Sequence, residues 1–295
     1  MKLAAVDIGS NAIRLQVTKV IEYQGQVKFK KLEYLRFPLR LGQDVFKLKY
    51  ISEVNKAKFM QLMHAFKLLI DLYEVDSYMA CATSAMRESA NGAEIAADVN
   101  NLFGLKIEII DGSQEADIIN KAFGHKLDDK KYLHIDVGGG STELILYHKK
   151  KQIASSSFKI GSVRRLGLHE SPKIFEEMTA WILNHVRPDQ GTITAIGTGG
   201  NINKVKDLAK IKKSAKFIKR EKIEEIKQFV AGYTLEERIN ILELNPDRAD
   251  VIIPATEIYI AVMKSAKAEK IMIPDVGLKD GIMQILFERA YANIK

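Results

Sequence analysis

The sequence lacks both paired cysteines and long apolar segments. Cys81 is the single cysteine among 295 residues, so an internal disulfide is excluded and a reducing compartment is favoured. No apolar run reaches about 18 residues, because Pro254 and Glu257 interrupt even the segment 251–263. The acid Asp7 comes before the apolar core of a secretion signal could form. We therefore expect a cytoplasmic protein that does not associate with a membrane.

Several common catalytic motifs are missing as well. The six histidines are scattered, and none lies four residues from another or directly before an aspartate, which argues against zinc and HD-type metal sites. The phosphate loop Gly-Lys-Ser/Thr and the nucleophile elbow Gly-x-Ser-x-Gly do not occur either. These absences exclude the usual P-loop nucleotidases and α/β-hydrolases.

The composition is that of an ordinary globular protein with a moderate positive charge. Hydrophobic residues make up 46% and charged residues 28%, which excludes disorder or a coiled coil as the whole structure. The net charge of +8 makes polyanions plausible partners. Residues 204–227 hold ten basic against four acidic side chains, and residues 28–49 hold seven against two. Each stretch is either a solvated face or a track for a polyanion.

A pattern of strand, tight turn and strand occurs twice. With an offset of 129, the apolar and acidic positions of residues 6–17 match those of residues 135–146. A chain of 295 residues has room for two domains, so the repeat predicts two related halves that face one another. We expect the domains at residues 1–127 and 128–295, with a hinge near Asp128.

Strands alternate with helices along the chain, which predicts an α/β fold. Apolar residues recur at helical spacing after the candidate cap Ser52, and a last helix over about 278–292 can return to pack on the first domain. The other expected elements are strands at 78–83, 105–110 and 192–196, and helices at 176–185 and after 111–113.

Glycines are concentrated in two short segments. Residues 138–142 (GGGST) and 197–201 (GTGGN) hold six of the 19 glycines in ten positions. Glycine lets the backbone come close to an anion and expose several N–H groups to it, and a following helix adds its positive end. The alternative is two tight turns without a ligand.

Hydroxyl, guanidinium and amide groups follow the strand expected at 78–83. The segment 83–92 (TSAMRESANG) offers Thr83, Ser84 and Arg87, and an arginine fork matches the oxygens of a phosphate. Alternatively, Ser84 caps a helix and Arg87 pairs with an acid such as Glu88.

Carboxylates stand at equivalent places of the two repeats. Asp7 and Asp136 match one another, and Glu143 follows on the return strand. Such acids suit Mg²⁺, which prefers oxygen ligands, although they can also cap turns. Glu115 lies early in a helix and is a candidate general base for water. The helix N-terminus lowers the pKa of such a group and burial raises it, and the sequence leaves these opposing effects open.

Five motifs in order resemble the Ppx/GppA family of exopolyphosphatases and guanosine pentaphosphate phosphohydrolases. They are VDIGSN at 6–11, ATSAMRESANG at 82–92, DGSQEA at 111–116, DVGGGSTE at 136–143 and RADVI at 248–252. The resemblance implies the actin-like ATPase fold, in which two ribonuclease-H-like domains flank a central cleft with the active site. It also implies Mg²⁺, direct attack of water on a terminal phosphoanhydride, and inorganic polyphosphate or guanosine pentaphosphate (pppGpp) as substrate.

The resemblance also assigns residues by position. Glu115 would align or deprotonate the water, and Asp136 and Glu143 would hold Mg²⁺ or support that water. From its equivalence to Asp136 in the repeat, Asp7 is expected as a third metal ligand. The residues expected to bind phosphate are Gly9, Ser10, Asn11, Arg14, Thr83, Ser84, Arg87, Gly138, Gly139, Gly140, Ser141, Gly197, Thr198, Gly199, Gly200 and Asn201.

The sequence departs from the family pattern at three points. Ala12 stands where a second serine is usual, and Gln114 stands where the family often has a glutamate, which narrows the candidate base to Glu115. The extra C-terminal HD-like region of long members has no room in 295 residues, so we expect a short form without it.

The leading hypothesis is therefore an exopolyphosphatase. The alternatives are a pppGpp 5′-phosphohydrolase, an ATP-dependent kinase or ATPase whose segment 197–201 seats adenosine, and a non-catalytic sensor on the same fold. No nucleic acid partner is expected, and the resemblance allows a homodimer.

Overall fold

The chain forms two compact units. The computed structural model describes residues 1–124, 127–166, 172–186, 192–210 and 215–292. Unit 1 comprises Met1–Phe123 and Gly277–Lys295, and unit 2 comprises Gly124–Val276. The division after Phe123 lies close to the expected boundary at 127/128. The C-terminal helix is part of unit 1, so unit 1 is built from two separate stretches of the chain.

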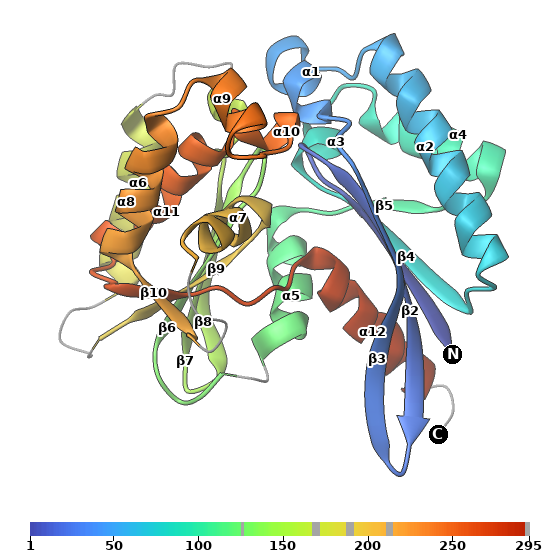
Figure 1. The fold of residues 1–295 in the computed structure, drawn as a ribbon. Helices are drawn as coiled ribbons and strands as arrows, with labels where there is room; N and C mark the ends of the chain where they lie inside the picture. Colours follow the sequence, from blue (N-terminus) through green and yellow to red (C-terminus); the bar gives the residue numbers. More distant parts are fainter. Residues whose placement is uncertain (125–126, 167–171, 187–191, 211–214, 293–295) are drawn as a thin grey trace. The chain divides into compact units, whose positions relative to one another are not determined.

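Unit 1 is organised around a five-stranded sheet with the order β3-β2-β1-β4-β5 (Figure 1). The first three strands form an antiparallel meander, whereas β4 and β5 run parallel to β1. The strands are β1 Lys2–Ile8, β2 Ile13–Tyr23, β3 Gln26–Phe37, β4 Ser77–Ala82 and β5 Ile107–Ile109.

Six helices complete unit 1. Helix α2 begins as expected, because the Ser52 side chain accepts a hydrogen bond from the Asn55 N–H at 3.4 Å. Its buried residues Phe59, Met63 and Phe66 follow the helical period that the sequence displays. The helices are α1 Leu41–Leu48, α2 Glu53–Leu72, α3 Ser84–Glu88, α4 Gly92–Phe103, α5 Gly112–Phe123 and α12 Leu278–Ala292.

Helix α12 packs against α5 at the sheet of unit 1 (Figure 1). Gly281 makes this close approach possible, because a Cβ at this position would overlap the carbonyl oxygen of Ile118. An ion pair of 2.9 Å joins Lys121 to Glu288, and the Phe287 ring meets the Phe29 ring of β3 edge to face. The C-terminal helix α12 thus holds α5 through a close backbone contact and an ion pair.

Unit 2 has a six-stranded sheet with the order β10-β11-β9-β6-β7-β8. Strands β6, β7 and β8 form an antiparallel meander, and β9 and β11 run parallel to β6. The strands are β6 Tyr132–Val137, β7 Thr142–His148, β8 Lys151–Phe158, β9 Thr194–Thr198, β10 Phe217–Lys219 and β11 Lys270–Met272. The helices are α6 Pro172–His185, α7 Gly200–Leu208, α8 Arg220–Ala231, α9 Leu235–Asn240, α10 Pro246–Ala249 and α11 Ile252–Ser265, with a short 3-10 turn at Arg164–Leu166.

The two sheets repeat one topology. In both units a three-stranded meander is followed by two further strands parallel to the first, so β1-β2-β3-β4-β5 corresponds to β6-β7-β8-β9-β11. The register repeats as well, since Asp7 lies opposite Arg14 and Asp136 lies opposite Glu143. The predicted duplication is therefore confirmed, and with it the α/β class.

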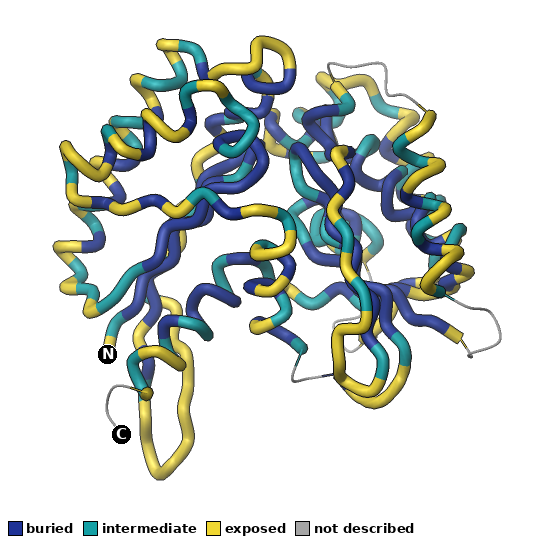
Figure 2. Tube along the Cα trace, turned by 180° about the vertical axis from the view of Figure 1, so that it is seen from behind, coloured by how far each residue is buried: buried dark blue, intermediate teal, exposed yellow. Residues whose placement is uncertain are grey.

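Burial is highest in the central strands of each sheet. Strand β1 is buried from Leu3 to Ile8, whereas most of β3 is exposed, and Figure 2 shows the tip of the β2–β3 hairpin in yellow. Cys81 lies buried in β4. Among the described helices, none combines the length and the apolar character that a membrane crossing requires.

Candidate functional site

The predicted site residues gather at one edge of each sheet. Strands β1, β4 and β5 are parallel in unit 1, and β6, β9 and β11 are parallel in unit 2. The carboxyl ends of parallel strands meet at the same edge, where ligands bind in open α/β sheets. In each unit the loops that leave these ends carry the residues singled out from the sequence. The cleft expected from the resemblance stays a prediction.

In unit 1, the turn after β1 contacts the start of α3. The Gly9 N–H donates to the Ala12 carbonyl oxygen at 3.2 Å, which closes the turn that holds Ser10 and Asn11. The hydroxyls of Ser10 and Ser84 lie 2.8 Å apart in a hydrogen bond. Both serines are nearly buried, so the structure brings together two residues that are 74 positions apart in the sequence.

Thr83 and Arg87 belong to the same edge. Thr83 caps α3 through its backbone and donates its N–H to the Ile8 carbonyl oxygen at 3.1 Å, which ties β4 to the end of β1. The Arg87 guanidinium donates to the carbonyl oxygen of Ile110 at 2.6 Å. This bond places Arg87 directly before the start of α5.

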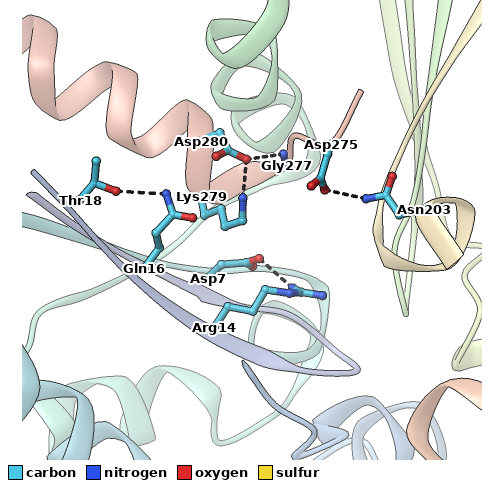
Figure 3. A network of polar contacts seen from close by, with 9 residues as sticks. All are labelled: Asp7, Arg14, Gln16, Thr18, Asn203, Asp275, Gly277, Lys279 and Asp280. Carbon is cyan, nitrogen blue, oxygen red and sulfur yellow. Dashed lines mark hydrogen bonds and ion pairs between the residues drawn. The ribbon is translucent and has the colours of Figure 1, made fainter. Parts of the chain in front are cut away.

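Asp7 and Arg14 form an ion pair across β1 and β2 (Figure 3). The guanidinium lies 2.8 Å from the carboxylate, and both side chains are largely buried. Because each partner neutralises the other, metal binding by Asp7 and phosphate binding by Arg14 compete with the existing pair. Both roles stay predictions.

In the first turn of α5, Gln114 takes part in the helix cap, which leaves Glu115 as the candidate base. The Asp111 carboxylate accepts hydrogen bonds from the N–H groups of Ser113 and Gln114, at 2.8 and 2.9 Å. The Gln114 side chain in turn accepts from the Asp111 N–H at 2.9 Å, which completes a reciprocal cap. The Gln114 side chain therefore caps the N-terminus of the helix, whereas Glu115 is half-buried beside it.

Glu115 and Asp7 share a neighbourhood around Cys81. Burial, together with the negative charges of Glu108, Asp7 and Glu115, raises the pKa of the Cys81 thiol to about 12. The carboxylates of Glu115 and Asp7 are therefore both close enough to the Cys81 thiol of β4 to raise its pKa. The thiol stays protonated and belongs to the core.

In unit 2, two carboxylates face each other where unit 1 has an ion pair. Asp136 on β6 lies opposite Glu143 on β7, at the register position of Asp7 and Arg14. Ser157 donates to the Glu143 carboxylate at 2.9 Å, and Glu143 is only 2% exposed. A cation would relieve the repulsion between two adjacent carboxylates, and Mg²⁺ is commonly held by one or two carboxylates together with water and phosphate oxygens. The described residues contain no group of three or more His, Cys, Asp or Glu side chains placed to hold a metal. The pair therefore fits an Mg²⁺ ion that takes its remaining ligands from water and from the substrate.

The second glycine segment approaches this carboxylate pair. A Cβ at Gly199 would lie 3.2 Å from an oxygen of Asp136, and the φ of +108° is one that only glycine adopts easily. Gly200 begins α7, and a Cβ there would lie 3.0 Å from the guanidinium of Arg248. Asn201 lies in the first turn of α7 and is mostly buried.

The beginning of this segment belongs to a strand. Gly197 and Thr198 are the last two residues of β9 and are buried, and phosphate binding by them stays a prediction. The Thr198 hydroxyl is within 2.8 Å of His134 Nε2, and a Cβ at Gly197 would lie 2.8 Å from the side chain of Ile271. Burial lowers the pKa of His134 to about 3, so this histidine is neutral at physiological pH. The loop proper begins at Gly199.

Tyr259 of α11 joins the ends of β6 and β9. The last register pair of these strands is Asp136 with Thr198, and beyond it the two glycine segments diverge. The Tyr259 hydroxyl accepts from the Val137 N–H at 3.2 Å and donates to the Thr198 carbonyl oxygen. Burial together with the charges of Asp136 and Glu143 raises the pKa of Tyr259 well above its usual value. Tyr259 was not among the residues predicted for the site, although its hydroxyl lies within the apolar segment 251–263 and would need a partner when buried.

Replacing Tyr259 by phenylalanine should lower the free energy of unfolding by about 1–3 kcal/mol, because it leaves the buried Val137 N–H without an acceptor. Urea unfolding followed by circular dichroism measures the loss. Tyr233→Phe is the matched control, since the Tyr233 ring packs edge to face on Phe229 and its hydroxyl joins no strands among the described residues. Equal stabilities of the two variants would contradict the bridging role.

Residues 160–164 were not predicted as part of the site, and Arg248 was identified only as part of the motif RADVI, without a role. The first group lies beside the loop 138–141 although it follows β8, and Arg248 reaches Gly200 from α10. The basic stretch 28–49 lies on β3 and α1, where most of the lysines are exposed. Of the stretch 204–227, residues 211–214 lie outside the described residues. A polyanion track stays a prediction for both stretches.

Two α/β units of one topology, with glycine loops and acids at the carboxyl edges of their sheets, define an actin-like fold. The sequence pattern of the Ppx/GppA phosphatase family matches residues 20–289. The chain therefore belongs to the Ppx/GppA phosphatase family, whose members are phosphoanhydride hydrolases.

Individual relatives agree with this assignment. A guanosine-5′-triphosphate,3′-diphosphate pyrophosphatase of Photobacterium profundum is 23% identical over 95% of the chain, which spans 58% of that protein. A bifunctional 3-dehydroquinate synthase/phosphatase of Fusobacterium nucleatum is 32% identical over 55% of the chain, which aligns with 25% of its length. The crystal structure of an exopolyphosphatase from Cytophaga hutchinsonii shares the fold, with a TM-score of 0.81, 19% identity and 98% coverage of both chains.

Proposed function

We propose that the protein is an exopolyphosphatase, which converts a polyphosphate of n units and water into a polyphosphate of n−1 units and phosphate. The observation that carries the proposal is the carboxylate pair Asp136 and Glu143, placed between two glycine loops at one sheet edge. Glycine loops that can bind anions, beside acids that can hold a cation, suit a substrate that is itself a chain of phosphates.

The carboxylate pair would hold Mg²⁺. When bound, Mg²⁺ supplies positive charge that offsets the negative charge spreading over the transferred phosphoryl group. Ser157 fixes the Glu143 carboxylate through its 2.9 Å hydrogen bond, and Gly199 leaves room beside Asp136. The Ser157 hydroxyl therefore keeps Glu143 in place, and the missing side chain at Gly199 leaves Asp136 accessible to the cation.

Glu115 acts as the general base in this proposal. Hydrolysis requires a water in line with the bond that breaks, and a half-buried carboxylate at a helix start can accept the proton of that water. The cap formed by Asp111 and Gln114 fixes the first turn of α5 and thereby the position of Glu115.

Phosphate oxygens bind to backbone N–H groups and to side chains in this proposal. The groups are the loop 138–141, Gly199, Gly200 and Asn201 in unit 2, and Ser10, Ser84 and Arg87 in unit 1. Arg248 joins them because its guanidinium lies against Gly200. The basic stretches 28–49 and 204–227 would attract the rest of a polyphosphate chain.

Hydrolysis of the 5′-terminal phosphate of pppGpp is the second candidate function. The relative from Photobacterium profundum, whose name describes this activity, matches 95% of the chain. The chemistry is the same phosphoanhydride cleavage, so the same acids and loops would serve it.

Phosphate release by the wild-type chain tests the proposal. Polyphosphate, pppGpp and ATP are incubated in parallel with Mg²⁺, and with EDTA in its place. Release that is fastest from polyphosphate and lost with EDTA is the expected result. Faster release from pppGpp would establish the second candidate, and ATP turnover that needs an added acceptor would indicate a kinase. No release from any of the three would refute hydrolysis and favour a sensor.

A further inference from the structure

The loop 138–141 is backed along one side by residues 160–164, which we call the backing segment. The carbonyl oxygen of Gly138 accepts from the Ser162 N–H at 3.0 Å. The carbonyl oxygen of Gly139 accepts from the N–H groups of Val163 and Arg164, at 2.8 and 2.9 Å. The carbonyl oxygen of Gly140 accepts from Arg164 Nε at 2.7 Å. Three successive carbonyls of the loop thus point toward the same segment.

This arrangement fixes the direction of three N–H groups. In a trans peptide, the carbonyl of one residue and the N–H of the next point in opposite directions, and every described peptide is trans. The N–H groups of Gly139, Gly140 and Ser141 therefore point away from the backing segment. Within the described chain none of them donates a backbone hydrogen bond. Successive N–H groups on one side of a loop form a concavity for an anion.

The backing segment is close enough only because Gly161 has no side chain. A Cβ at Gly161 would lie 2.6 Å from the carbonyl carbon and oxygen of Gly139 and from the nitrogen of Gly140. These are backbone atoms, which cannot move aside as a side chain can. The contact between segment and loop is therefore a built feature of unit 2.

Arg164 makes the strongest contribution to this contact. The residue is nearly buried, with 7% exposed. Arg164 donates its backbone N–H to the Gly139 carbonyl oxygen and its Nε–H to the Gly140 carbonyl oxygen. A charged donor forms a stronger hydrogen bond than a neutral one. We propose that Arg164 is a positioning residue of the anion site, which orients the N–H groups of Gly140 and Ser141 without touching the substrate. The proposal rests on the proposed function only in taking phosphate as the anion.

The adjacent Arg165 provides a matched control. Its guanidinium donates to the Pro254 carbonyl oxygen at 2.9 Å, pairs with Glu257 at 2.9 Å and lies over the Phe175 ring. These contacts are made with α11 and α6, so removal of this side chain costs a comparable set of bonds without changing the loop.

Phosphate binding to the full chain, labelled with 15N, tests the proposal. Inorganic phosphate is titrated with Mg²⁺ present, and the amide resonances of Gly139, Gly140 and Ser141 are followed. In the wild type these three resonances should shift together. Arg164→Met should raise the Kd of phosphate by about tenfold, as expected for loss of a hydrogen bond to a charged group. Arg164→Lys should restore part of the affinity, because it keeps one charged donor, and Arg165→Met should leave the Kd unchanged.

An unchanged Kd in Arg164→Met would overturn the proposal, and so would equal losses in the two methionine variants. If Arg164→Met does not fold, the wild-type titration still decides, because no shift at the three amides would refute the orientation of the loop. The outcome is independent of turnover. Phosphate binding at these amides without phosphate release from any substrate would refute the hydrolase and support the role of Arg164.

Discussion

Replacing Glu115 by glutamine is expected to lower kcat for phosphate release by about 10²- to 10⁴-fold, the contribution typical of a general base. The substitution keeps the size of the side chain and removes only its capacity to take a proton from water. The cap of Asp111 and Gln114 does not involve Glu115, so α5 keeps its first turn. The affinity for inorganic phosphate should therefore stay within about twofold of the wild type, since a base acts on the reaction and not on ground-state binding.

Single-turnover release of phosphate, together with a phosphate Kd, separates the two quantities. Asp117→Asn is the matched control, because Asp117 is an exposed acid two residues farther along the same helix. It should leave both values unchanged. A kcat for Glu115→Gln equal to that of the wild type would remove Glu115 from the mechanism, and equal losses in both variants would indicate an effect of net charge.

Replacing Gly281 by alanine should destabilise unit 1 by about 1–3 kcal/mol or more, the usual cost of an overpacked core. The added Cβ would overlap the carbonyl oxygen of Ile118 and lie 2.6 Å from its carbonyl carbon. Both are backbone atoms of α5, so the methyl group fits only if α12 and α5 move apart. Because α5 carries Glu115 at its start, we also expect a lower kcat with little change in phosphate affinity.

Urea unfolding monitored by circular dichroism measures the loss of stability. Gly277→Ala is the control, since a Cβ at that position meets nothing within 4 Å. A midpoint for Gly281→Ala that matches Gly277→Ala would show that the two helices tolerate a larger separation.

The features predicted well from the sequence depend on local patterns. Ser52 and the helical period after it predict α2, and the strand pattern repeated at an offset of 129 predicts two units of one topology. A cap and a periodic apolar face act within a few residues, so a sequence displays them directly.

The parts of the candidate site that the sequence did not predict depend on contacts between distant segments. Thr198 looks like a loop residue because glycines flank it, yet the hydrogen bond to His134 holds it at the end of a buried strand. Arg164 follows a surface strand and Tyr259 lies in an apolar helix, and only the fold brings them to the glycine loops. The register of β1 with β2 likewise places Arg14 opposite Asp7, whereas the register of β6 with β7 places Glu143 opposite Asp136.

The division of unit 1 into two stretches has a consequence for synthesis on the ribosome. Residues 124–276 are made before the segment 277–292, so all of unit 2 can fold while unit 1 still lacks α12. Until that helix arrives, the faces of α5 and β1 that it covers are open to chaperones and to other nascent chains. The order of translation thus makes the N-terminal unit the last to be completed.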